Sequence, residues 1–563
     1  MERYAPRMTL AAANAQLTGP GGIFETAIEP VRGEPMAVFR RRATSLRELL
    51  AASARFDSQD YYVFDDGRRA TFAEHRRDVA SVAKALRERF GIGPGDRVAI
   101  LGANSPEWIT SFWAITSLGA IAVGLNGWWQ GDEIEYGLGV SEPALLIADQ
   151  RRLDRLGGAD PGVRTLVMED DFARLLRHDP GAALPDHPID EDDPALLLFT
   201  SGTTGRPKGA INSHRNMLAF LALGAFAALR GMLLMRGRLE LPPAGGKPPA
   251  AIAASPLFHV SGLHGSAVTA MSSGMKLVWT TGRFDADKIL RLTFEEGISR
   301  WGGVTTHLYR LLEHPQLDRY DLSQITSVGG GGSTWSPELQ RLIREKLPGA
   351  TPAFQVGYGL TESAALLTMA DELMLRAHPD SVGCALATAQ IEIRGEDGRA
   401  LPDGRDGDIC ARGPMVMPGY WRNDKANAET LLPGGWLKTG DVGQLREDFL
   451  FLASRKRDLI LRGGENVYPV EIENRLEEHP GIAEAAVVGV PHRQLGQEVK
   501  AVVVPRPGAR LEPDAVRAFV AERLAYFKVP AQVELRSEPL PRNAAGKVLK
   551  HVLTGEPNPF VED

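Results

Sequence analysis

A short apolar segment that runs directly into a loop of hydroxyl groups and glycines is the feature that most constrains this chain. Leu196–Phe199 are four consecutive apolar residues, which is typical of a strand buried on both faces. The next residues are Thr200, Ser201, Gly202, Thr203, Thr204 and Gly205, followed by Lys208. Glycines let a backbone approach a ligand closely, and backbone N–H groups beside a lysine can bind an anion. The segment therefore predicts a polyphosphate-binding loop.

Two other interpretations of this loop are less favourable. A surface turn would account for some Gly, Ser and Thr residues, but not for so many of them beside one lysine. The common nucleotide loop GxxxxGK[ST] fails on spacing, because Gly202 and Gly205 are only three positions apart. Gly209 follows Lys208, so no hydroxyl group follows the lysine to hold magnesium. We therefore expect a phosphate loop of a different architecture.

The composition indicates a globular protein of two or more domains. Its 563 residues are too many for one compact core, and charged residues make up 24% of the chain. The net charge of −7 disfavours non-specific binding of nucleic acid. Cys384 and Cys410 are the only cysteines, which excludes a disulfide framework. We recognise no signal peptide and no uninterrupted apolar run long enough to span a bilayer, and we therefore expect a cytoplasmic protein.

Strands that alternate with helices indicate an α/β fold class with parallel-rich sheets in the first part of the chain. A capping box from Thr71 to Glu74 predicts a helix start. Residues 1–45 show no clear period, and Arg40–Arg42 is expected to be a solvated basic run. Strands are expected at residues 97–101, 120–125 and 144–148, and a hairpin is expected to turn at Asp66–Gly67.

The sequence pattern changes after about residue 380. Short segments joined by Asp-Gly turns suggest a distorted β-barrel that completes a large N-terminal domain of residues 1–454. Residues 455–563 are expected to form a smaller, mobile α+β C-terminal domain.

Five segments together resemble the motifs of the adenylate-forming superfamily, which includes acyl-CoA synthetases, adenylation domains and beetle luciferases. The resemblance covers roughly residues 60–550, and the segments occur in the family order. The segments are SGTTGRPKG (201–209), GYGLTES (357–363), GWLKTGDVG (435–443), RKRDLILRGGEN (455–466) and PRNAAGKVLK (541–550).

This resemblance implies a set of nucleotide contacts. Tyr358, in the segment with Gly357 and Gly359, would stack on adenine. Thr361 would contact the α-phosphate, and Glu362 would hold Mg²⁺ together with Thr200. The ribose would be bound by Asp441. The adenine-pocket loop would contain Gly331, Gly332 and Ser333, although Ser333 and Thr334 replace the usual Ala and Pro.

The resemblance also implies roles for residues near the C-terminus and for one histidine. Lys547 would drive adenylation, although Asn543 and Ala545 depart from the usual threonines. Arg455 would touch the ribose or the α-phosphate, and Arg457 would be the hinge. His259 would lie between the acyl pocket and the nucleotide. The pantetheine tunnel would be lined by Gly463, Gly464, Glu465 and Asn466.

The reaction implied by the resemblance uses ATP, Mg²⁺ and CoA to activate a carboxylic acid, first as an acyl-adenylate and then as a thioester. The segments expected to line the acyl pocket are rich in Gly and Ala and have no acidic residue, Lys or Arg, which favours a fatty acid or a bulky ring-bearing acid. A stand-alone enzyme that loads a carrier protein is the main alternative. Luciferase-type oxygenation and a binding-only protein are weaker ones, and a homodimer stays open.

Overall fold

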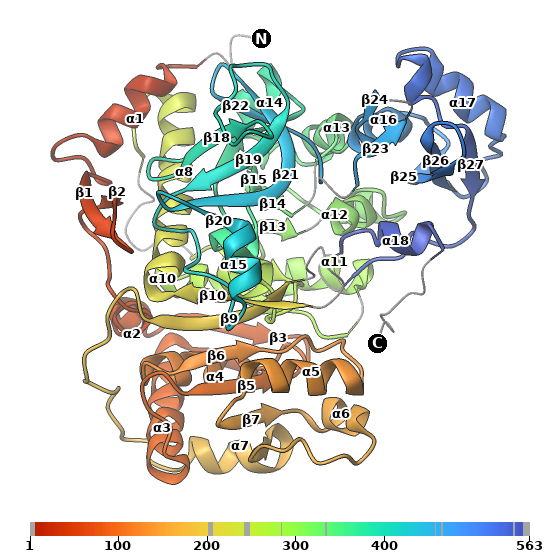
Figure 1. The fold of residues 1–563 in the computed structure, drawn as a ribbon. Helices are drawn as coiled ribbons and strands as arrows, with labels where there is room; N and C mark the ends of the chain where they lie inside the picture. Colours follow the sequence, from red (N-terminus) through yellow and green to blue (C-terminus); the bar gives the residue numbers. More distant parts are fainter. Residues whose placement is uncertain are drawn as a thin grey trace.

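The computed structural model describes residues 6–200, 207–240, 248–282, 284–303, 305–332, 335–455, 458–462, 465–543 and 546–555, with only the backbone of Ser454, Arg455 and Asn466. Figure 1 shows a large domain of two stacked α/β layers and a smaller C-terminal domain beside its upper half.

The first sheet has six strands and carries the predicted phosphate loop at one edge. Five strands are parallel, and the edge strand β10 returns antiparallel to β9. Its order is β10 (Lys208–Ser213), β9 (Pro194–Thr200), β6 (Ile121–Gly124), β5 (Arg97–Leu101), β7 (Leu145–Ala148) and β8 (Thr165–Val167). These strands confirm those predicted at 97–101, 120–125, 144–148 and 196–199.

Helices cover both faces of this sheet, as continuous apolar strands require. Val98 and Ile100 belong to one core cluster together with α3 and α4, whereas Ala99 and Leu101 pack in a second cluster with α5. The predicted capping box is present at the start of α3. The helices are α3 (Phe72–Phe90), α4 (Pro106–Ser117), α5 (Gly131–Ser141), α6 (Gln150–Leu153) and α7 (Met168–Leu176).

The second sheet is parallel in its centre and antiparallel toward its C-terminal strands. The parallel part is β3 (Asp60–Phe64), β12 (Lys276–Trp279), β11 (Ala250–Ala253), β13 (Arg300–Gly303), β14 (Ser327–Gly331) and β15 (Phe354–Tyr358), with β4 (Arg69–Thr71) antiparallel at one edge. The predicted hairpin joins β3 to β4.

The antiparallel strands expected after residue 380 continue this sheet through β16. Next to β16 (Thr368–Asp371), they are β17 (Ser381–Ala385), β22 (Phe449–Arg455), β21 (Trp436–Arg446), β19 (Gly407–Arg412) and β18 (Gln390–Arg394), with the short β20 (Leu431–Leu432) beside β21. The helices are α8 (His214–Arg236), α9 (Val260–Gly262), α10 (Thr269–Ser273), α11 (Ala286–Glu295), α12 (Thr305–Leu312), α13 (Pro337–Lys346), α14 (Glu372–Ala377) and α15 (Asp424–Thr430). A π-helix, Leu263–Val268, joins α9 to α10.

Helix α8 is long and apolar enough to cross a membrane by length and composition alone, although Arg215 and Arg230 interrupt its apolar sequence. Its contacts identify it as a core helix. Leu223, Phe226 and Leu233 are fully buried in the largest core cluster. Arg230 is also buried, and its guanidinium donates a hydrogen bond to the carbonyl of Met369 at 3.0 Å. The apolar surface of α8 is therefore accounted for by packing within the protein.

The N-terminal segment forms regular structure that its sequence did not reveal. It contains α1 (Leu10–Thr18), the antiparallel pair β1 (Thr26–Val31) and β2 (Glu34–Phe39), and α2 (Leu46–Ala52). Only Ala13 and Leu17 of α1 are buried, so its amphipathic pattern is weak. Their burial comes from α8, which packs against α1 (Figure 1).

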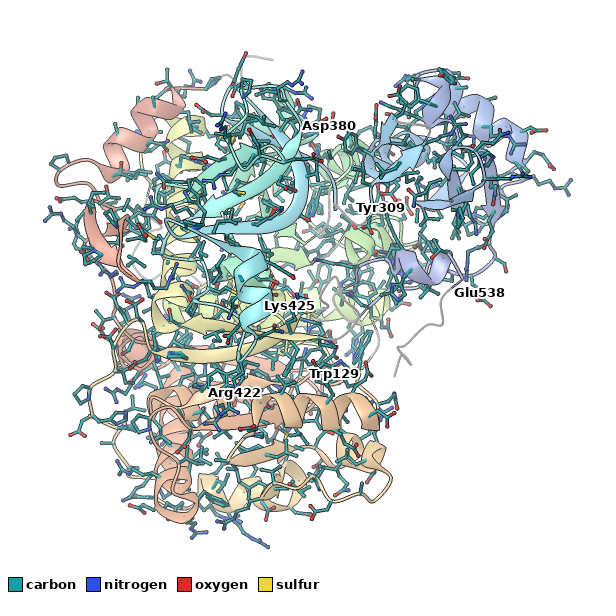
Figure 2. The ribbon with its side chains drawn as sticks, viewed as in Figure 1. Trp129, Tyr309, Asp380, Arg422, Lys425 and Glu538 are labelled. Carbon is teal, nitrogen blue, oxygen red and sulfur yellow. The ribbon has the colours of Figure 1, made fainter. Side chains whose placement is uncertain are left out.

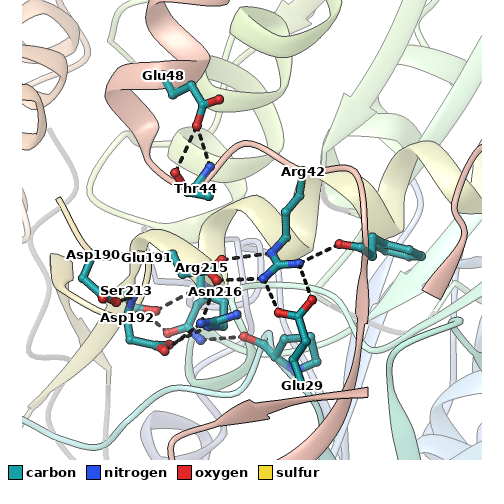
Figure 3. A network of polar contacts seen from close by, with 12 residues as sticks. Glu29, Arg42, Thr44, Glu48, Asp190, Glu191, Asp192, Ser213, Arg215 and Asn216 are labelled. Carbon is teal, nitrogen blue, oxygen red and sulfur yellow. Dashed lines mark hydrogen bonds and ion pairs between the residues drawn. The ribbon is translucent and has the colours of Figure 1, made fainter. Parts of the chain in front are cut away.

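The expectation of a solvated run at Arg40–Arg42 is wrong for Arg42, which belongs to an ion-pair network (Figure 3). Its guanidinium lies 2.7 Å from carboxylate oxygens of both Glu29 and Glu191. Arg215 at the start of α8 pairs with the same Glu191 at 2.8 Å and with Asp192 at 2.6 Å. The hydrogen bonds that Arg42 donates to both carboxylates raise its pKa. The network fastens the N-terminal hairpin to α8.

The C-terminal domain has its own sheet and its own apolar core. Val487 and Val503 of adjacent strands pack against Ile472 and Leu476 of α16. Its strands are β23 (Ile460–Arg462), β24 (Glu465–Val467), β25 (Ile482–His492), β26 (Gly496–Pro505) and β27 (Gln532–Leu535), and its helices are α16 (Pro469–Glu477), α17 (Pro513–Ala521) and α18 (Lys550–Leu553). The division of the chain after residue 454 stays a proposal.

Candidate active site

The two ends of the predicted phosphate loop lie side by side on the edge hairpin of the first sheet. Thr200 ends β9 and Lys208 begins β10, and the two are paired across the ladder. The ammonium of Lys208 lies 5.2 Å from the ring centroid of Tyr420, a cation–π contact. The loop residues Ser201, Gly202, Thr203, Thr204 and Gly205 lie outside the described residues.

Tyr358 and Asp441, which come from two separate motifs, form one buried pair. Tyr358 ends β15 and Asp441 lies in β21, and the tyrosine hydroxyl donates to Oδ2 of Asp441 at 2.8 Å. Each of the two residues is 7% exposed. The backbone of Arg455 lies opposite Asp441 on the neighbouring strand β22. The fold therefore brings the residues expected at adenine and ribose into direct contact, which their sequence positions did not show.

Thr361 and Glu362 lie in a single 3₁₀ turn directly after β15. The carbonyl of Thr361 accepts a hydrogen bond from the side-chain amide of Asn212 at 3.3 Å. The turn continues into Ala364 and Ala365, whose φ angles of 49° and 84° lie in the left-handed region. Residues other than glycine are rare there, and such strain is concentrated at ligand-binding sites.

Tyr420 is a site residue that the sequence analysis missed. Its hydroxyl donates to Oε1 of Glu362 at 2.8 Å, and the neighbouring backbone N–H of Met417 donates to the Glu362 carbonyl at 2.9 Å. The segment GPMVMPGYW (413–421) holds both residues, and its glycines and terminal aromatics were the available signal.

The residues predicted to hold Mg²⁺ fit a hard cation that keeps phosphate and water among its ligands. Among the described residues, no group of three or more His, Cys, Asp or Glu side chains could hold a metal ion. One carboxylate at Glu362 and one hydroxyl at Thr200 are the oxygen ligands that a substrate-bridged Mg²⁺ takes from a protein. Only Oε1 of Glu362 is used by Tyr420, so the carboxylate retains acceptor capacity.

Glycines in β14 and after β15 are required by close backbone packing. A β-carbon on Gly331 would lie 2.5 Å from the carbonyl oxygen of Gly357 on the next strand. A β-carbon on Gly359 would lie 2.3 Å from the carbonyl oxygen of Ala365. Gly332 has a φ of +82°, which favours glycine directly. Ser333, predicted with these glycines, lies outside the described residues.

Lys547 is brought from the C-terminal domain to the edge of this site. Its backbone N–H donates to Oδ1 of Asn543 at 2.9 Å, which fixes the backbone of the lysine. A β-carbon placed on Gly332 would lie 3.9 Å from Cε of Lys547. Lys547 also lies near His259: burial and, to a smaller extent, the positive charge of Lys547 together lower the pKa of His259 to about 4. The structure thus joins Lys547, Gly332 and His259.

The second predicted C-terminal feature lies away from Lys547. Glu465 and the backbone of Asn466 form β24, which pairs with β23. Figure 1 shows both strands at the upper end of the C-terminal domain, separated from α18. Gly463, Gly464 and the predicted hinge Arg457 lie outside the described residues. The arrangement therefore presents Lys547, rather than the 465–466 strand, to the candidate site.

Polar contacts join the two domains in this arrangement. The hydroxyl of Tyr309 on α12 lies 2.9 Å from Oγ of Ser336 and 3.2 Å from Oε2 of Glu477 on α16. Arg506 pairs with Glu313 at 2.6 Å. The hydroxyl of Tyr468 donates to Asp406 at 3.1 Å. In Figure 2, Tyr309 lies where the large domain meets the C-terminal domain.

Known proteins with this fold and these motifs identify the family. Residues 50–421 match the family described as AMP-binding enzyme, and residues 471–547 match its C-terminal domain. The chain is 34% identical to a feruloyl-CoA synthase from an Amycolatopsis species, over 86% of this chain and 93% of that protein. It is 31% identical to a long-chain-fatty-acid–CoA ligase of Bacillus subtilis, over 90% and 93% of the two chains.

A solved structure agrees with this assignment. ATP-bound MatB from Rhodopseudomonas palustris matches with a TM-score of 0.77 at 29% identity, over 91% of this chain and 98% of that chain. The chain therefore belongs to the adenylate-forming superfamily of AMP-binding enzymes. Within it, the chain is an AMP-forming acid–CoA ligase.

Proposed function

We propose that this ligase activates an apolar carboxylic acid, fatty or ring-bearing, with ATP and Mg²⁺ and then transfers the acyl group to CoA. The observation that carries the proposal is the position of Lys547 beside Gly332 and His259. That position puts one cation where the expected nucleotide pocket meets the expected acyl path.

The first half-reaction follows from the charges at this site. The carboxylate attacks the α-phosphorus of ATP, the bond to the bridging oxygen breaks, and pyrophosphate leaves with its electron pair. Negative charge is spread over phosphate oxygens in the transition state, so fixed cations and N–H donors contribute most to the rate. Lys547 is proposed to contact both the carboxylate and the α-phosphate, and Thr361 is proposed to donate to the same phosphate.

The buried pair Tyr358 and Asp441 is proposed to hold the nucleoside. Tyr358 offers a ring face for adenine, and Asp441 accepts hydrogen bonds from ribose hydroxyls. Because the Tyr358 hydroxyl already occupies one oxygen of Asp441, the carboxylate orientation is fixed before ATP binds. Mg²⁺, when bound by Glu362 and Thr200, would neutralise charge on the phosphates.

The second half-reaction moves the acyl group to a thiol. The sulfur of CoA attacks the acyl carbonyl, the bond to the phosphate oxygen breaks, and AMP leaves. The thiol needs space at the carbonyl, and Lys547 is proposed to contact the carboxylate from which that carbonyl is formed. We propose that the C-terminal domain withdraws Lys547 and presents the 463–466 segment for this step.

The proposed acid class rests on the walls of the acyl path. Gly302 and Gly303 end β13, and Gly329 and Gly330 lie beside them on β14. A β-carbon on Gly302 would meet only the carbonyl oxygen of Gly329, at 3.2 Å, so side-chain space is open above it. Small, uncharged walls favour a bulky apolar substrate. One relative is named for a ring-bearing acyl group and another for long-chain fatty acids, which agrees with both proposed acid classes.

A panel of carboxylic acids tests this proposal. Straight-chain acids of increasing length, arylpropenoic acids, benzoic acids, dicarboxylic acids and amino acids would each be incubated with ATP and Mg²⁺, and pyrophosphate release measured. CoA would then be added and products identified by mass spectrometry. We expect acyl-CoA from fatty or aryl acids and none from amino acids. Preference for a dicarboxylic acid or an amino acid would refute the proposed class, and adenylation without transfer to CoA would refute the proposed acceptor.

A further inference from the structure

Tyr420 contacts two oppositely charged residues of the candidate site at once. Its hydroxyl donates to Oε1 of Glu362 at 2.8 Å, and its ring face lies 5.2 Å from the ammonium of Lys208. The ring therefore stands between an anion and a cation that the proposed function assigns to the metal and phosphate end of ATP. Neither the sequence motifs nor the known family roles given above include Tyr420.

The backbone around Tyr420 is fixed to the phosphate-loop hairpin. The N–H of Ile211 donates to the carbonyl of Gly419 at 3.0 Å, and the N–H of Trp421 donates to the carbonyl of Gly209 at 2.8 Å. The side chain of Asn427 then accepts from the N–H of Tyr420 at 2.7 Å and donates to its carbonyl at 3.1 Å. These hydrogen bonds thus hold Tyr420 beside β10, and the residue is 7% exposed.

Lys208 has a different environment on its other side. There it lines an open pocket together with Tyr136, Pro207 and Trp421. A long, flexible ammonium with water on one side is oriented by what it meets on the other, which is the negative face of the Tyr420 ring.

We propose that Tyr420 is a positioning residue for adenylation, acting through both Glu362 and Lys208. This inference rests on the proposed function. The hydroxyl orients the Glu362 carboxylate so that its remaining acceptor capacity points to Mg²⁺. The ring holds Lys208 toward the leaving pyrophosphate and prevents a direct ion pair, which would withdraw both charges from the substrate. Two parts of one side chain thus have two separable effects.

Two substitutions separate these effects. Tyr420→Phe keeps the ring and removes the hydroxyl, so it should lower kcat for pyrophosphate release about tenfold, the loss expected for one hydrogen bond to a charged group, with little change in KM for MgATP. Tyr420→Leu also removes the ring face, so it should in addition weaken competitive inhibition by pyrophosphate several-fold. Thiolysis of supplied acyl-AMP uses neither group and should be unchanged in both variants.

A double-mutant cycle distinguishes positioning from general damage to the fold. In a Glu362→Gln background, Tyr420→Phe should cause little further loss, because its partner has already been changed. Tyr320→Phe is the matched control, since it removes a tyrosine hydroxyl from a residue that stacks on Phe294 in the large domain. We expect its kcat for pyrophosphate release to stay near that of the parent.

The outcomes separate this inference from the proposed function. A parent enzyme that releases pyrophosphate with no acid in the panel would contradict the proposed function. An active parent whose Tyr420→Phe variant keeps its full kcat would overturn the inference alone. So would losses that add fully in the double mutant, or an equal fall in adenylation and thiolysis, because these show damage that does not act through Glu362.

Discussion

Replacing Tyr309 with phenylalanine should loosen the C-terminal domain from the arrangement that presents Lys547 to the site. The substitution keeps the ring of Tyr309 and removes a hydroxyl that lies 2.9 Å from Oγ of Ser336 and 3.2 Å from Oε2 of Glu477. Ser336 belongs to the large domain, and Glu477 belongs to the C-terminal domain. The change therefore removes one polar contact that crosses the domain junction, with little change in shape.

The expected loss of free energy follows from the geometry of this contact. A hydrogen bond to a buried charged group contributes about 1.5–3 kcal/mol, and one between neutral groups about 1 kcal/mol. The distance between the Tyr309 hydroxyl and the Glu477 carboxyl is long for an O–H···O hydrogen bond. Burial also raises the pKa of Glu477, which disfavours the charged carboxylate. We therefore take about 1 kcal/mol, which corresponds to a shift of roughly fivefold in the equilibrium between domain arrangements.

Single-turnover measurements of the two half-reactions test this expectation. Pyrophosphate release should slow by up to about fivefold, whereas thiolysis of supplied acyl-AMP should keep its rate or gain. Tyr320→Phe is a matched control, because Tyr320 stacks on Phe294 within the large domain. An equal loss in both half-reactions with a lower melting temperature would show that Tyr309 stabilises the fold. Unchanged rates in both would refute its role at the junction.

Three further predictions concern the lysine, the nucleoside pair and buried histidines. Lys547→Ala should reduce pyrophosphate release by about 10²–10³-fold and spare thiolysis of acyl-AMP, and near-normal release would contradict its role. Asp441→Asn should raise KM for ATP about tenfold in steady-state assays, since it keeps a polar partner for Tyr358 but loses the charge, and an unchanged KM would exclude ribose binding. Burial lowers the pKa of His75 and His264 to about 3, below the unfolded value, so the unfolded state binds more protons as pH falls. The free energy of unfolding should then fall below pH 6.5 by about 1.4 kcal/mol per pH unit for each histidine, and urea titrations of His264→Gln should show a shallower dependence on pH.

Strands in the first sheet could be predicted because a strand that is buried on both faces consists of consecutive apolar residues. RVAIL gives β5 at Arg97–Leu101, since a parallel strand covered on both faces needs apolar residues throughout. Helix α4 could be predicted from its N-cap, Ser105, and the proline that follows it. The N-terminal elements could not, because the pattern of α1 is weak and its burial depends on α8, some two hundred residues later in the chain.

Candidate site residues could be predicted one motif at a time, but their contacts could not. Tyr358 and Asp441 are 83 positions apart, and only the pairing of distant strands brings them into contact. Tyr420 and Glu362 are 58 positions apart. They come into contact because the segment around Tyr420 is hydrogen-bonded to β10. A motif therefore indicates which residue types bind, whereas the partner that orients each residue is a property of the fold.

The junction between the domains agrees with the proposal that Lys547 serves only the first half-reaction. The apolar clusters of the C-terminal domain contain only its own residues, and so do those of the large domain. Across the junction, the described contacts are polar: Tyr309 with Glu477, Arg506 with Glu313 and Tyr468 with Asp406. The two partly exposed pairs, Arg506–Glu313 and Tyr468–Asp406, contribute at most about 1 kcal/mol each, and water replaces them when they separate. The buried Tyr309–Glu477 contact contributes about 1 kcal/mol. Reorientation of the C-terminal domain would not open either core. The proposed withdrawal of Lys547 before thiolysis would therefore have a small cost in free energy.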